Sequence, residues 1–60
     1  MSPQALRQKR RDAGLSQEML ARHVGVTIGT IRNWEKGVTV PTLANGKALE
    51  TFFKRLDSEG

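Results

Sequence analysis

The chain of 60 residues carries 10 Lys and Arg against 6 Asp and Glu, which gives a formal net charge of +4 at pH 7. A chain this short forms one domain, and only about 60% of its unfolded surface is buried on folding, which leaves a small core and no room for a deep substrate pocket. The basic excess, concentrated in the run RQKRR at residues 7–11, favours a polyanionic partner, and the absence of cysteine excludes disulfides and thiolate chemistry.

The first predicted helix begins after Ser2, which can cap its N-terminus, and it has Pro3 in the first helical position that proline favours. It presents Leu6 and Arg10 on one side and ends at Gly14.

A second, short helix is predicted after Ser16, another N-cap residue, with Gln17 and Glu18 in its first turn. The apolar residues of this helix are Leu20, Ala21 and Val24, and their spacing places them on one helix face before Gly25 ends the helix. This helix is barely two turns long.

The third predicted helix is capped by Thr27 and stopped by Gly37, with Ile31 and Trp34 on its inner side. Its other positions face outward, namely Thr27, Ile28, Gly29, Thr30, Arg32 and Asn33. A face of this composition raises the question of which partner it contacts.

The fourth predicted helix follows a brief extended connection, VTV at residues 38–40, which Pro41 ends. Thr42 can cap this helix, and Gly46 within it costs roughly 1 kcal/mol relative to alanine. Its buried side is marked by Leu43, Leu49, Phe52, Phe53 and Leu56. Because no segment alternates polar and apolar residues as a half-buried strand would, the sequence predicts an all-α fold.

Four residues in the middle of the chain have the order that a helix-turn-helix requires. Two helices that meet at a steep angle need a small residue at their close approach, a residue able to take positive φ in the turn, and apolar anchors on the second helix. Ala21 supplies the first, Gly25 the second, and Ile31 with Trp34 the third. Any two short helices of a bundle could use alanine and glycine in this way, so the order of the four residues carries the prediction.

The stretch from about Leu6 to Phe53 resembles the phage lambda and 434 repressor and Cro type of helix-turn-helix domain, the bacterial group called XRE-like. The segment LSQEMLARHVGVTIGTIRNWEKG carries the likeness, with SQ at the start of the second helix and WEKG at the end of the third. The resemblance implies a compact, lambda-repressor-like bundle of four short helices, or five if the end of the chain adds a stub. It further implies a single DNA-binding domain over residues 1–60, with the helix-turn-helix unit at about 17–36.

The function implied by the resemblance is that of a sequence-specific transcriptional regulator, here expected to be a repressor. Such a protein binds double-stranded DNA of a palindromic operator as a homodimer, with its third helix in the major groove. The base contacts are then expected on Thr27, Ile28, Gly29, Arg32 and Asn33. Ile28 can contact a thymine methyl group and Asn33 can pair bidentately with adenine, whereas Arg32 is open to a base contact, a phosphate contact or a purely solubilising role.

Contacts to DNA phosphates are expected from Ser16, Gln17, Thr30, Lys36 and Thr39. Gln17 has separate physical support, because the first N–H groups of a helix are unpaired and carry a partial positive charge that attracts phosphate.

The resemblance also implies an ion pair between Arg10 of the first helix and Glu35 at the end of the third. Removal of one partner of such a pair would cost several kcal/mol. Phe52, Phe53 and Leu56 are candidates for a dimer surface, because KRLDSEG leaves at most a stub for a fifth helix. Closure of the monomer core is the alternative role, above all for Phe53.

Signs of catalysis or metal binding are missing from the sequence. His23 is the one histidine, and a single ligand cannot hold a metal ion. The acidic residues show no spacing that would bring two carboxylates together for catalysis. We therefore expect no metal, no cofactor and no enzymatic activity. No apolar run approaches the roughly 20 residues that span a bilayer, and RQKRR lacks the apolar flanks of a membrane-surface helix, so we expect a cytoplasmic protein without membrane contact.

Two alternatives remain open at this point. The chain could be a protein-interaction module of the same fold, with Ile28, Gly29 and the VTV segment as its docking surface. It could also be the DNA-binding part of an antitoxin, of a restriction controller or of a longer regulator with a C-terminal sensing domain. Binding that weakens steeply with added salt would favour DNA over a protein partner, because phosphate contacts release counterions.

Overall fold

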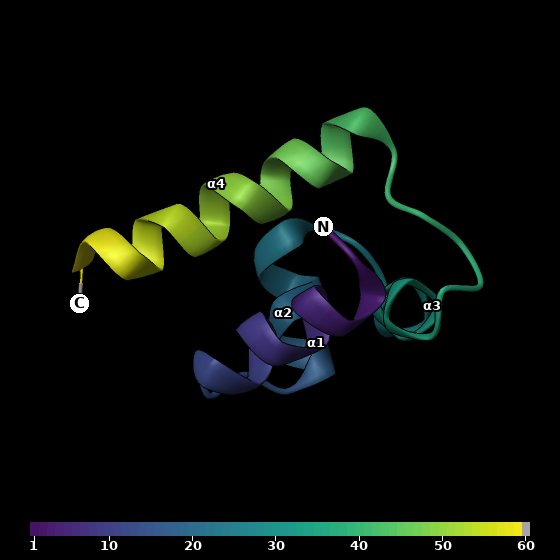
Figure 1. Ribbon diagram of the computed structural model, residues 1–60, viewed down its shortest axis with the longest axis horizontal. Coiled ribbons are helices and arrows are strands. Elements are labelled where there is room, and N and C mark those ends of the chain that lie inside the picture. Colours follow the sequence, from purple (N-terminus) through teal and green to yellow (C-terminus); the bar gives the residue numbers. More distant parts are fainter. Residues whose placement is uncertain (60) are drawn as a thin grey trace.

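A computed structural model describes residues 1–59, and in this range it contains four helices and no strand. The helices are α1 (Pro3–Asp12), α2 (Gln17–Val24), α3 (Ile28–Lys36) and α4 (Leu43–Glu59), with α4 lying across the other three (Figure 1). The all-α prediction is therefore confirmed. A separate fifth helix is not found in this range, because α4 continues without a break through residue 59.

Each helix begins at a hydroxyl side chain that accepts a hydrogen bond from a backbone N–H three residues later. The distances are 3.1 Å from Ala5 N to Ser2 Oγ, 3.0 Å from Met19 N to Ser16 Oγ, 3.3 Å from Thr30 N to Thr27 Oγ1 and 3.2 Å from Asn45 N to Thr42 Oγ1. These bonds satisfy N–H groups that have no partner inside the helix, and they confirm the four predicted helix starts.

Glycine ends both helices of the central pair in the left-handed conformation. Gly25 has φ 85° after α2, and Gly37 has φ 76° after α3. The N–H groups of Gly25 and Val26 both donate to the carbonyl oxygen of Ala21, at 2.8 and 3.0 Å, which closes the end of α2. A side chain at such a φ would be strained, and for this reason glycine fits both positions.

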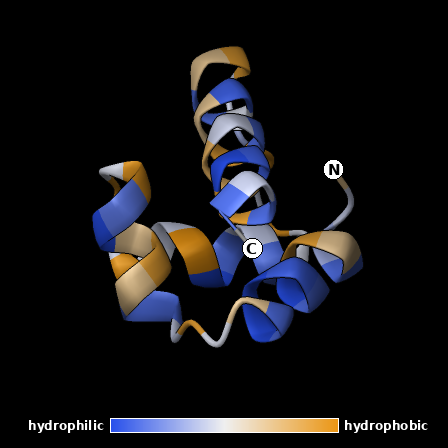
Figure 2. Ribbon diagram, turned by 90° about the vertical axis from the view of Figure 1, so that its left-hand side faces the viewer, coloured by the Kyte–Doolittle hydropathy of each residue, from blue (hydrophilic) through white to orange (hydrophobic). Residues whose placement is uncertain are grey.

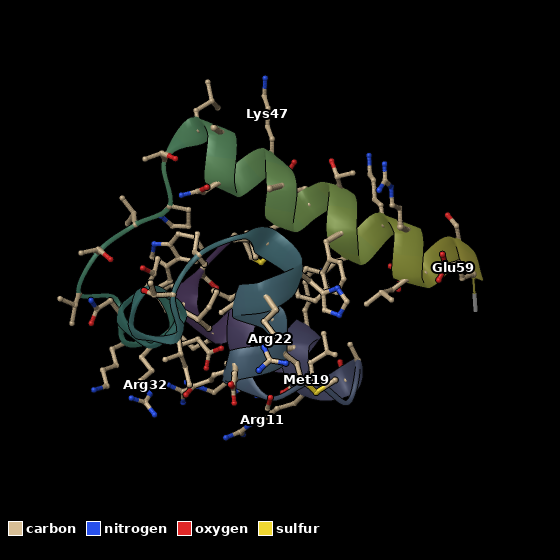
Figure 3. All side chains as sticks on the ribbon, turned by 180° about the vertical axis from the view of Figure 1, so that it is seen from behind. Arg11, Met19, Arg22, Arg32, Lys47 and Glu59 are labelled. Carbon is tan, nitrogen blue, oxygen red and sulfur yellow. The ribbon has the colours of Figure 1, made fainter. Side chains whose placement is uncertain are left out.

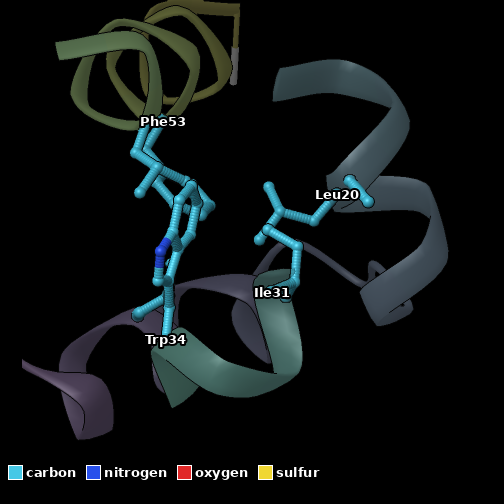
Figure 4. Packing of buried hydrophobic residues seen from close by; sticks show 7 residues of the cluster. Leu20, Ile31, Trp34 and Phe53 are labelled. Atoms are coloured by element: carbon cyan, nitrogen blue, oxygen red, sulfur yellow. The ribbon is translucent and has the colours of Figure 1, made fainter. Parts of the chain in front are cut away.

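The core lies where α2, α3 and α4 meet, and its three most deeply buried side chains are Leu20, Ile31 and Leu49, one from each helix. Figure 4 shows Ile31 facing Leu20, while Trp34 extends from α3 toward Phe53 of α4. α1 contributes a single buried residue, Leu6, and its ribbon beside the N label in Figure 2 is coloured mostly hydrophilic.

One expectation for α4 is wrong. Leu43 was assigned to the buried side, but it is 78% exposed because it starts the helix beyond the edge of the core. Phe53 was open to two roles, a dimer surface or closure of the core, and it takes the second, because it is only 6% exposed and packs in the core with Trp34. Phe52 and Leu56 are half-buried, and Phe52 stacks on His23 of α2 with ring centroids 4.8 Å apart.

Candidate nucleic-acid interface

The turn between α2 and α3 consists of three residues, from Gly25 to Thr27. Ala21 is buried next to this turn, and it has no side chain beyond Cβ to hold the two helices apart. Ile31 and Trp34 anchor α3 in the core. Together these features form a helix-turn-helix over residues 17–36.

The outward side of α3 is exposed over the positions expected to read bases. Thr27, Ile28, Gly29, Arg32 and Asn33 are all exposed, and Thr30 is half-buried. The hydroxyl oxygens of Thr27 and Thr30 lie 2.9 Å apart and share a hydrogen bond. Gly29 is not required by the fold, because a Cβ added there would meet only Thr27 Oγ1, at 3.9 Å.

The ion pair expected between Arg10 and Glu35 is present at the junction of α1 and α3. Arg10 Nε donates to Glu35 Oε2 at 2.6 Å, and Arg10 Nη2 donates to Oε1 at 3.0 Å. The side chains of Arg10 and Glu35 are 11% and 2% exposed. Arg10 Nη1 also donates to the carbonyl oxygen of Leu15 at 2.9 Å, so the guanidinium joins α3 to the connection between α1 and α2.

The surroundings of Glu35 hold its carboxyl group in the ionised form. Burial by itself raises the pKa of this group, but the hydrogen bonds from Arg10 and Gln17 and the charges of Arg10 and Arg7 outweigh it, and the pKa lies below its usual range. The hydrogen bond that Arg10 donates to Glu35 correspondingly raises the pKa of Arg10.

Two further side chains contact Glu35, Arg7 and Gln17, and Arg32 contacts Gln17, although the sequence pattern connected none of the three with Glu35. Arg7 Nη2 donates to the backbone oxygen of Glu35 at 3.2 Å, and Arg7 Nε lies 3.7 Å from Oε1. Gln17 Nε2 donates to Oε1 at 3.3 Å, and Gln17 Oε1 accepts from Arg32 Nε at 3.4 Å. The spacing of Arg7 and Arg10 on one face of α1 was the available signal for Arg7.

Three arginine side chains share the side of the molecule that faces away from α4. Figure 3 shows Arg11, Arg22 and Arg32 on the side opposite to Lys47. Arg22 is bonded to Glu18 one turn earlier at 3.1 Å, an exposed pair of little energetic weight.

The end of α3 and the connection after it are exposed, including Lys36 and Thr39, two of the expected phosphate contacts. Its backbone is tied back to α3, because the N–H of Val38 donates to the carbonyl oxygen of Asn33 at 2.9 Å. Val38 and Val40 are 67% and 81% exposed, so this connection presents apolar side chains to solvent.

Within residues 1–59, no group of three or more His, Cys, Asp or Glu side chains is arranged to hold a metal ion. Among the same residues, no helix has both the length and the apolar character needed to cross a membrane.

The short turn, the anchored α3 and its exposed outward face define a helix-turn-helix protein of the class that binds DNA. A family model described as helix-turn-helix matches residues 6–58, and the chain belongs to this family, the Cro/C1-type, XRE-like DNA-binding transcription regulators. No curated protein and no solved structure gives a significant match to the chain.

Proposed function

We propose that the protein is a transcriptional repressor that binds a palindromic operator as a homodimer. Each copy places α3 in the major groove, and the half-sites lie one helical turn, about 34 Å, apart. The observation that carries this proposal is the outward side of α3, which is exposed along the positions expected to contact base edges.

The side chains on this face favour a half-site that contains A·T pairs. Ile28 offers an apolar contact to a thymine methyl group, and the Asn33 amide has the donor and acceptor that pair with adenine. Thr27 can hydrogen-bond a base or a phosphate. Gly29, which the fold does not require, permits close approach of the helix backbone to the groove.

The DNA backbone is expected to run along both ends of this face. Ser16 and Gln17 lie at the start of α2, where unpaired N–H groups and the helix dipole attract a phosphate. Thr30, Lys36 and Thr39 are the corresponding candidates on α3 and the connection that follows it. These contacts position the protein and carry no base information of their own.

Dimer formation on DNA would draw on the residues of α4 that the core leaves partly open. Phe52 and Leu56 are half-buried and remain candidates for this contact, whereas Phe53 belongs to the core. In the proposed dimer the two α3 helices face the same side of the duplex.

The test is selection of bound duplexes from a random library of about 25–30 base pairs, long enough for two half-sites one turn apart. We expect an inverted repeat, whose affinity falls steeply as salt is raised because each phosphate contact releases counterions. Asn33→Ala should then relax the preference at one base pair per half-site by roughly 1–3 kcal/mol. Lys36→Gln is the matched control, and it should weaken all sequences alike. Absence of any enriched sequence at moderate salt would refute a sequence-specific operator.

A second candidate function is supported by the exposed Val38, Val40 and Leu43, which form an apolar stretch beside the start of α4. Such a surface suits a protein partner. Under this alternative the chain docks a protein, and the affinity for that partner changes little between low and high salt, in contrast to the steep loss expected for DNA.

A further inference from the structure

Arg32 and Gln17 connect the outward side of α3 to the start of α2. Arg32 Nε donates to Gln17 Oε1 at 3.4 Å, and Gln17 Nε2 donates to Glu35 Oε1 at 3.3 Å. Arg10 holds the same carboxylate at 2.6 and 3.0 Å. The four side chains therefore form one continuous series from a buried ion pair to the surface.

The buried carboxylate of Glu35 decides which way the amide of Gln17 faces. An ionised carboxylate can only accept hydrogen bonds, so the NH₂ group of Gln17 has to point inward and its oxygen outward. A DNA phosphate also offers only acceptor oxygens. The outward oxygen of Gln17 therefore needs a hydrogen-bond donor as its partner. A phosphate oxygen placed directly against this amide oxygen would be repelled.

Arg32 supplies a donor at this place. Its side chain is exposed and lies on the same side as Arg11 and Arg22 (Figure 3). Its bond to Gln17 uses Nε, and the two Nη groups make no hydrogen bond within residues 1–59. A guanidinium held by one edge can present its remaining N–H groups to a phosphate in the bidentate geometry that suits both.

We propose that Arg32 binds a phosphate of the DNA backbone next to the start of α2, and that Gln17 is a positioning residue that holds the guanidinium of Arg32 there. This inference rests on the proposed DNA-binding function and deepens it. The phosphate contact expected of Gln17 is made through Arg32, and Arg32 does not read a base. Sequence reading on α3 then falls to Thr27, Ile28 and Asn33.

The first experiment measures the salt dependence of DNA binding for Arg32→Gln, with the selected operator and with a duplex of unrelated sequence. Affinity falls as salt rises, and loss of one phosphate contact should make the plot of log affinity against log salt shallower by about 0.9. This change corresponds to about an eightfold loss of affinity at 0.1 M salt. The loss should be the same for both duplexes, because a phosphate contact carries no base information. Lys47→Gln is the matched control, since Lys47 is exposed on the opposite side and its removal should leave the slope unchanged.

The second experiment tests the positioning role of Gln17 with a double-mutant cycle. Gln17→Met keeps the length of the side chain and removes its polar atoms. It should weaken binding in the wild-type background and have no further effect in the Arg32→Gln background, because its influence passes through Arg32. Arg32→Lys provides a second comparison that does not depend on how well the Gln17 variant folds, since it retains the charge but lacks Nε. It should keep the salt slope and lose affinity by a smaller factor than Arg32→Gln.

Several results would overturn the inference. If Arg32→Gln changes the preference at one base pair and leaves the salt slope intact, Arg32 reads a base. If the effects of the Gln17 and Arg32 substitutions add, Gln17 contacts phosphate independently. In both cases the wild-type protein still binds its operator and the proposed function stands. If the wild-type protein binds neither duplex in a salt-dependent manner, both the function and this inference fail.

Discussion

Arg10→Met is the substitution that most directly tests the energetic role of the buried ion pair. It removes a guanidinium that donates two hydrogen bonds to Glu35, at 2.6 and 3.0 Å, and leaves a carboxylate whose side chain is 2% exposed. Breaking a buried pair in this way costs about 3–5 kcal/mol. Because Arg7 and Gln17 still face the carboxylate, we expect the lower end, about 3 kcal/mol.

This loss is large for a chain of 60 residues, whose total stability is expected to be about 3–9 kcal/mol. At 4–8 °C per kcal/mol for a domain of this size, the Tm should fall by roughly 12–24 °C. Thermal and urea unfolding followed by circular dichroism would measure the change. Arg11→Met is the matched control on the same helix, because Arg11 is exposed and has no bond to Glu35.

The dependence on pH provides a second measurement of the same pair. The pKa of Glu35 is lowered in the folded protein, so its contribution to stability is complete above the unfolded pKa of about 4.3 and is lost as the pH falls through the folded value. In Arg10→Met the hydrogen bond and charge of Arg10 are gone, so we expect burial to raise the pKa of Glu35. Lowering the pH then protonates the Glu35 carboxylate and removes an unfavourable buried charge. The difference in stability between the two proteins should therefore narrow from pH 7 to about pH 3.

A loss below about 1 kcal/mol, or a difference that stays constant down to pH 3, would refute this reasoning. The double variant Arg10→Met/Glu35→Leu separates the two causes of destabilisation. It should be more stable than Arg10→Met alone, because it leaves no charge buried without its partner.

Three further substitutions test the local determinants of the helices, each by urea unfolding. Gly25→Ala should destabilise the protein by about 1–2 kcal/mol, because alanine is strained at the φ of 85° that this position requires. The added Cβ meets no neighbour, so the backbone strain is the whole effect, and a neutral result would show that this conformation is not needed. Gly46→Ala should stabilise it by roughly 0.5–1 kcal/mol, since the Cβ again meets nothing within 4 Å and the site lies inside α4; a loss would contradict this account. Ser2→Ala should cost about 1 kcal/mol through the lost cap on Ala5 N, whereas Ser2→Thr, which keeps the hydroxyl, should cost less.

The helix boundaries could be predicted because the signals that set them are local. Each N-cap hydroxyl bonds a backbone N–H only three residues away, and Gly25 and Gly37 stop their helices by taking positive φ. Such interactions depend on the chemistry of a few neighbouring residues, which is written directly in the chain. The helical spacing of Ile31 and Trp34 likewise predicted which side of α3 is buried.

The burial along α4 was predicted less well for a physical reason. Periodicity indicates which residues share a helix face, but it does not say where along the helix the core ends. Leu43 and Phe53 were both assigned to an apolar side of α4, yet only Phe53 lies over α3 and the core. Leu43 is one turn too early to be covered by another helix.

The sequence by itself determined the four helices, the turn at Gly25 and the family to which the chain belongs. Only the tertiary structure decided that Arg7 and Gln17 meet at Glu35 and that Arg32 meets Gln17. These side chains come from three helices and are separated by up to 28 positions in the chain, so their meeting depends on how α1, α2 and α3 cross. The orientation of the Gln17 amide, and with it the position of Arg32, follows from the buried charge of Glu35 and is invisible to any local pattern.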